Sequence, residues 1–178
     1  HTNKDCIFIC DDVVREVMKY YNNNLVDAVI KKVGSMIIHE CVHIWQRREP
    51  KFFVRLYESW GFFYQNHIYN FNKYRKLSRY NPDGLELTWV FNLDTVNEAS
   101  ADCLKSTKPR NVVLPAALYR DDAQNISDVN LIGLYLEKIG NTYIISPFPR
   151  SEYLSNIKEF VEMFGKIASN NYHPNEVA

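Results

Sequence analysis

The chain has 178 residues, and its 21 Lys and Arg residues balance its 21 Asp and Glu residues, so the formal net charge is zero. Proteins that hold nucleic acid or an anionic membrane through phosphate groups carry an excess of Lys and Arg, which this sequence lacks. With 46% hydrophobic and 14% aromatic residues, the chain can form a buried core. The composition therefore excludes a disordered chain and argues against nucleic-acid and membrane partners. The length predicts a single domain over residues 1–178.

The first part of the chain has the pattern of helices. An apolar segment from Val13 to Tyr21 ends at a run of asparagines. From Leu25 onward apolar residues recur with helical spacing, and a closing pair of arginines suits the negative end of the helix dipole. Pro50 is expected to open a second helix that ends before Gly61. A third, more polar helix is predicted from Asn66 to Arg79.

The second part of the chain has the pattern of β-strands. The turn signal Asn-Pro-Asp-Gly at 81–84 precedes β-branched and aromatic runs at 87–93, 112–119 and 131–138. Gly140 and Asn141 predict a tight hairpin turn into a further strand. An amphipathic helix is expected from Glu152 to Ala168. The predicted fold class is α+β, with a small antiparallel sheet formed mainly by residues 85–146.

One motif in the helix that starts at Leu25 points to chemistry. The segment His39-Glu40-Cys41-Val42-His43 matches His-Glu-x-x-His. At 3.6 residues per turn, the side chains of His39, Glu40 and His43 share one arc of the helix. Both imidazoles can therefore reach a single Zn²⁺ ion, with Glu40 beside it as a general base for water. The sequence thus predicts one zinc ion as cofactor.

This motif resembles that of the zincin metallopeptidases. The resemblance implies a zincin-like single domain, in which the active-site helix packs with other helices and a small antiparallel β-sheet. It also implies zinc-dependent hydrolysis of peptide bonds in a peptide or protein substrate. Glu49 stands where the long-spacer zincins have their third histidine, so a gluzincin-like arrangement with a glutamate as third ligand is expected. The order of motifs along the chain is also similar to that of uncharacterised zincin-like proteins from large DNA viruses and microbes.

Two glutamates are candidates for the third zinc ligand. Glu176 follows His-Pro-Asn in a segment similar to the openings of third-ligand helices in smaller His-Glu-x-x-His families, with Tyr172 and His173 as candidates to orient a ligand or stabilise an oxyanion. Glu98 is the alternative, because the segment from Asn97 to Asp102 resembles the thermolysin-like Asn-Glu-x-x-x-Asp segment, in which the aspartate orients a zinc-bound imidazole. Glu176 is the favoured candidate.

Two further functions stay open, namely a zinc-binding but non-catalytic interaction domain and a metal-free structural or interaction domain. The four cysteines are expected to be buried free thiols rather than disulfides. The sequence shows neither a signal peptide nor an apolar run of membrane-spanning length. These features favour an intracellular, monomeric protein.

Overall fold

The computed structural model of the chain describes residues 2–3, 5–79, 88–96, 111–125, 127–146 and 149–165. The chain divides into two compact units, one of residues 1–53 with 82–85, the other of residues 54–81 with 86–178. The single domain expected over residues 1–178 stays a prediction.

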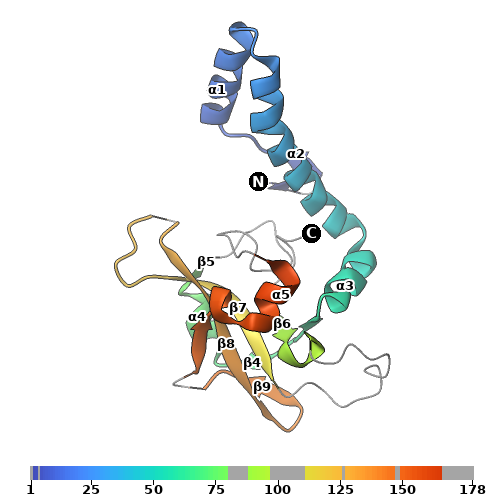
Figure 1. The fold of residues 1–178 in the computed structure, drawn as a ribbon, viewed down its shortest axis with the longest axis vertical. Helices are drawn as coiled ribbons and strands as arrows, with labels where there is room; N and C mark the ends of the chain where they lie inside the picture. The colour runs from blue at the N-terminus through green and yellow to red at the C-terminus, as the bar shows by residue number, and fades with distance from the viewer. Residues whose placement is uncertain are drawn as a thin grey trace. The chain divides into compact units, whose positions relative to one another are not determined.

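The first unit contains the two longest helices described (Figure 1). A two-residue hairpin of β1 (Thr2–Asn3) and β2 (Cys6–Ile7) precedes α1 (Asp11–Asn22), which contacts α2 (Val26–Arg48). Asn24 has a positive φ of 58°, which lets the chain reverse between α1 and α2. Pro50 opens α3 (Pro50–Ser59), which continues into the second unit. The structure confirms the first two predicted helices and the helix that begins at Pro50.

In its described residues, the second unit is built on a mixed sheet of eight strands that curls into a half-barrel. Its main path runs β3-β6-β7-β8-β9-β4, while β10 pairs with β8 and β5 pairs with β7. The described pairs are antiparallel except β4 with β9, which is parallel. The elements of this unit are β3 (Phe62–Tyr64), β4 (Ile68–Tyr69), α4 (Phe71–Arg75), β5 (Ser78–Arg79), β6 (Trp89–Asn92), the short 3₁₀ helix η1 (Leu93–Val96), β7 (Val112–Tyr119), β8 (Val129–Ile139), β9 (Thr142–Ile144), β10 (Ser151–Tyr153), the 3₁₀ helix η3 (Leu154–Asn156) and α5 (Lys158–Phe164).

Strand β7 lies at the centre of this sheet and is buried on both faces. All residues from Val112 to Ala117 are buried, which explains why the sequence there is a continuous apolar run rather than an alternating one. On one face Leu114 packs with Leu134 in a hydrophobic core cluster. Pro115, which has no N–H to donate, lies between the stretches of β7 that pair with β6 and with β5.

The other face of the sheet is covered by aromatic residues and α5. The Phe160 ring lies 5.1 Å from that of Phe91, and the Phe164 ring lies 5.5 Å from that of Phe62. Gly133 on β8 permits this close approach, because a Cβ added there would lie 2.6 Å from Ile157 Cδ1. The helix and the sheet therefore pack as one hydrophobic layer.

The predicted zincin-like α+β fold is wrong, since the second unit is a curled mixed sheet rather than a small antiparallel sheet packed on helices. The error lies mostly in residues 66–79, which form β4, the short α4 and β5 instead of one helix. In addition, Phe62–Tyr64 and Ser151–Tyr153 join the sheet as strands. The hydrophobic periodicity of these segments could not identify them as strands, because each short strand is stabilised by its partner strand.

Other predicted elements agree with the structure to different degrees. The strand at 112–119 is confirmed, the strand at 131–138 extends slightly at both ends, and the Gly140-Asn141 turn joins β8 to β9. Within the described residues, only Lys158–Phe164 of the predicted last helix is α-helical, and Leu154–Asn156 forms the 3₁₀ helix η3. The predicted turn at 81–84 lies outside the described residues. In the described part of the chain, no helix is both long and apolar enough to cross a membrane.

Substitution of Gly133 by Val tests the close packing of α5 on the sheet. We expect Gly133→Val to lower the free energy of unfolding by about 1 to 3 kcal/mol, because the added atoms displace Ile157 from a filled core. Gly34→Ala in α2 is the control, since its Cβ would meet only Ile30 Cγ2, at 3.9 Å. Urea unfolding followed by circular dichroism measures both variants. Equal stability of Gly133→Val and the unsubstituted chain would contradict the packing described.

Candidate functional site

The His-Glu-x-x-His motif lies within the continuous helix α2, as the sequence predicts. The spacing of four residues places the Nε2 atoms of His39 and His43 only 3.1 Å apart. The two rings meet edge to face, with centroids 4.6 Å apart and planes at 85°. The Nε2 atoms of the two imidazoles are therefore in direct contact beside the helix.

His43 is held by a second contact on the same helix. Its Nδ1 atom lies 2.8 Å from Oε1 of Gln46, one helical turn further along. Both side chains are only 1% exposed, and within the described residues they are the buried polar side chains. The sequence analysis missed Gln46, although the spacing His-x-x-Gln places the amide on the same face of the helix as the histidine.

Glu40 is next to His39 in sequence and is half-buried. Its Oε2 atom is shielded from solvent. By helix geometry, Glu40 lies on the arc of α2 next to that of the two imidazoles. The rest of the predicted apolar side of α2 is only partly covered, since Val29, Val33 and Ile44 are half-buried while Val26 and Ile37 are exposed.

The pair of histidines fits a zinc ion. Two nitrogens that each lie about 2.0 to 2.1 Å from a tetrahedral zinc are about 3.3 Å apart, close to the separation of His39 and His43. A catalytic zinc site needs a third protein ligand. Among the residues that the structure describes, no group of three or more His, Cys, Asp or Glu side chains could hold a metal ion. The described residues thus bring together two imidazoles but no third ligand.

The remaining predicted site residues lie outside the described residues. This holds for both third-ligand candidates, Glu176 and Glu98, and for Tyr172, His173 and Asp102. Their proposed roles stay predictions.

Three cysteines lie in the first unit as free thiols. Cys6, Cys10 and Cys41 are all exposed, so the prediction that they are buried is wrong, although they are free as predicted. Cys41 lies within the motif on the solvent side of α2 and does not pack as a small hydrophobic residue. Cys103 lies outside the described residues.

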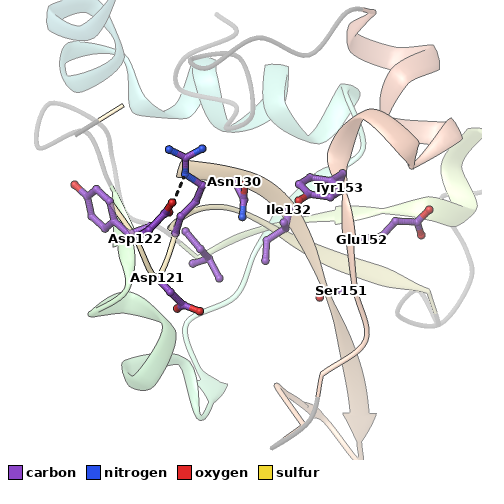
Figure 2. Close-up of a pocket in the computed structure, with 10 residues that line it drawn as sticks. Asp121, Asp122, Asn130, Ile132, Ser151, Glu152 and Tyr153 are labelled. Carbon is purple, nitrogen blue, oxygen red and sulfur yellow. Dashed lines mark ion pairs between the residues drawn. The ribbon is translucent and has the colours of Figure 1, made fainter. Parts of the chain in front are cut away.

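The second unit has a pocket of its own, unrelated to the motif (Figure 2). It is a cavity of about 570 Å³ at the β7–β8 connection, lined by Leu118, Tyr119, Arg120, Asp121, Asp122, Asn130, Ile132, Ser151, Glu152 and Tyr153. The Arg120 guanidinium forms ion pairs with Asp122 at 3.5 Å and with Asp128 at 3.2 Å, and Glu152 accepts a hydrogen bond from the Tyr135 hydroxyl at 3.1 Å. Sequence analysis did not single out this pocket, because its residues come from strands that only tertiary pairing brings together.

Comparison with family models, curated proteins and solved structures finds no match to this chain. The expectation of a zincin or gluzincin-like family is therefore wrong, since neither the comparisons nor the curled, strand-rich fold bears it out. The likeness to zincin-like proteins of large DNA viruses and microbes fails for the same reason. What persists is the local geometry of the motif on α2.

The pKa of Asp128 tests the hydrogen bonding of the loop that borders the pocket. Its Oδ2 atom accepts hydrogen bonds of 2.9 Å from the backbone N–H groups of Gln124 and Asn125. These bonds, and the nearby Arg120, lower the pKa of Asp128 below the ordinary value of 3.8. Because the folded-state pKa is depressed, the carboxylate stabilises the fold above its unfolded pKa, and this contribution is lost as the pH falls through the folded pKa.

We expect a carboxyl NMR titration of the full chain to place the Asp128 midpoint below that ordinary value. Asp128→Asn assigns the signal by removing it. In the same variant, amide exchange at Gln124 and Asn125 should become faster, because the acceptor is weaker. A titration midpoint at or above the ordinary aspartate value would contradict the hydrogen bonding described.

Proposed function

We propose that the chain is a zinc-dependent hydrolase of peptide bonds, in which His39 and His43 are zinc ligands and Glu40 is the general base. The observation that carries this proposal is the 3.1 Å separation of the two Nε2 atoms. It is supported by the burial of His43 and by the position of Glu40 on the same helix. The proposal depends on this local geometry and on no relationship to a known fold.

In this proposal, the histidines of α2 bind the metal and Glu40 transfers the proton. A zinc ion held by the two imidazoles would polarise the substrate carbonyl and lower the pKa of the attacking water. Glu40 accepts a proton from that water while the water oxygen bonds to the carbonyl carbon. Glu40 then gives the proton to the departing amine nitrogen as the carbon–nitrogen bond breaks. The products are a carboxylic acid and an amine, and Glu40 returns to its carboxylate form.

A third protein ligand completes this proposal. Glu176 is the favoured candidate and Glu98 the alternative, both from the sequence alone. The presence of Glu40 favours catalysis over a binding-only zinc site, because a site that only binds metal has no need of a base there. The zero net charge agrees with a substrate chosen by local contacts rather than by long-range attraction.

Substitution of Glu40 by Gln separates catalysis from metal binding. We expect Glu40→Gln to retain zinc but to lower peptide hydrolysis by about 10² to 10⁴-fold, because an amide cannot accept the proton. His39→Ala and His43→Ala should lose the zinc itself. Cys41→Ser is the matched control, since this exposed residue in the same motif should leave zinc content and turnover unchanged.

Elemental analysis of the purified chain and turnover of a quenched fluorescent peptide library measure these effects. Near-normal hydrolysis by Glu40→Gln would rule out the mechanism. Absence of zinc from protein purified without chelators and then dialysed against zinc would rule out the site.

Substitution of the two candidate glutamates identifies the third ligand. We expect Glu176→Gln to weaken zinc binding strongly, because a neutral amide is a poor zinc ligand, whereas Glu98→Gln should leave it unchanged. Competition with a chromogenic zinc chelator measures both affinities under the same conditions. The opposite result would assign the ligand to Glu98, and no effect of either substitution would show that another residue completes the site.

A further inference from the structure

We infer that Gln46 is a positioning residue that fixes the tautomer of His43 and so directs its Nε2 lone pair toward His39. This inference rests on the proposed zinc site, which it deepens by assigning a residue that the sequence motif does not contain. It is carried by the 2.8 Å contact between Gln46 Oε1 and His43 Nδ1, both in buried side chains.

The tautomer follows from the chemistry of the two atoms in contact. Oε1 of a glutamine side chain is a carbonyl oxygen and can only accept a hydrogen bond. His43 Nδ1 must therefore carry the proton and donate it to Gln46. A neutral imidazole has one protonated nitrogen, so Nε2 of His43 keeps its lone pair. That nitrogen is the one that lies 3.1 Å from His39.

The same argument assigns His39 in the metal-free protein. Because Nε2 of His43 has no proton, a hydrogen bond across the 3.1 Å separation requires Nε2 of His39 to donate. Zinc binding would then need only His39 to move its proton to Nδ1, while His43 is already in the ligating form. Gln46 thus prepares one of the two ligands before the metal arrives, in the way that outer partners commonly orient zinc-bound histidines.

Burial makes this role specific to Gln46. His43 and Gln46 are each 1% exposed, so water cannot easily replace the amide as the acceptor for Nδ1–H. The reverse orientation of the amide would place an N–H group against Nδ1 and force the proton onto Nε2. That arrangement would block His43 as an Nε2 ligand. The orientation of a single amide therefore affects how tightly the pair of histidines binds zinc.

The tautomers can be measured without zinc on the full chain labelled with ¹⁵N. At alkaline pH, two-bond ¹H–¹⁵N spectra distinguish the protonated from the unprotonated ring nitrogen of each neutral imidazole. We expect a protonated Nδ1 in His43 and a protonated Nε2 in His39. Gln46→Leu should abolish the His43 preference, whereas Gln46→Glu, which keeps an acceptor oxygen, should retain it. The exposed His67 is an internal control that neither variant should affect.

Zinc affinity is the second measurement. Gln46→Leu should weaken zinc binding by about 10 to 100-fold, and Gln46→Glu should restore it. A protonated Nε2 in His43 of the unsubstituted chain would overturn the inference, as would a tautomer and an affinity that Gln46→Leu leaves unchanged. If Gln46→Leu does not fold, as judged by circular dichroism, the unsubstituted chain and Gln46→Glu still decide the tautomer. If His43 shows the expected tautomer but the unsubstituted chain binds no zinc, the proposed function fails and the tautomer assignment stands.

Discussion

The pairing of β7 with β8 is the constraint on which the second unit depends. It runs from Val112 opposite Leu136 to Tyr119 opposite Val129, and it is the longest ladder in the described sheet. Because β7 is buried on both faces, side chains of the β7–β8 pair pack into apolar surroundings on each side of the sheet. Gly133 provides the room for this on the face that α5 covers, and Leu134 fills the opposite face. The remaining strands extend this central pair on either side.

The candidate site depends on a different and purely local constraint, the geometry of the α-helix. Residues four apart lie one above the other on one face, so His39 and His43 meet without help from any other element. Gln46 extends the same row by three residues and contacts the same imidazole. A half-site of this kind can form on any sufficiently long and stable helix. Its presence therefore says much about possible chemistry and little about fold, which is consistent with a zincin-type motif on a chain with a different architecture.

Elements whose signals are local in sequence were predicted correctly, whereas short strands that depend on distant partners were not. Helices α1, α2 and α3 were predictable, since their apolar spacing, the asparagine run and Pro50 are local signals. Strands β7 and β8 and the turn at Gly140 were predictable for the same reason. The strands within residues 62–79 were not, because two- and three-residue strands have no periodicity of their own and exist only through hydrogen bonds to distant partners.

The sequence by itself determined the side chains that form the candidate site. The order His-Glu-x-x-His-x-x-Gln on a continuous helix is enough to place two imidazoles, a carboxylate and an amide on neighbouring positions of one surface. Only the tertiary structure decided the curled mixed sheet, the parallel pairing of β4 with β9 and the burial that isolates His43 and Gln46 from water. The physical reason is the difference in sequence separation between the residues that make these two kinds of contact. Helical contacts join residues three or four apart, whereas sheet pairing and burial join residues whose separation in sequence carries no local signal.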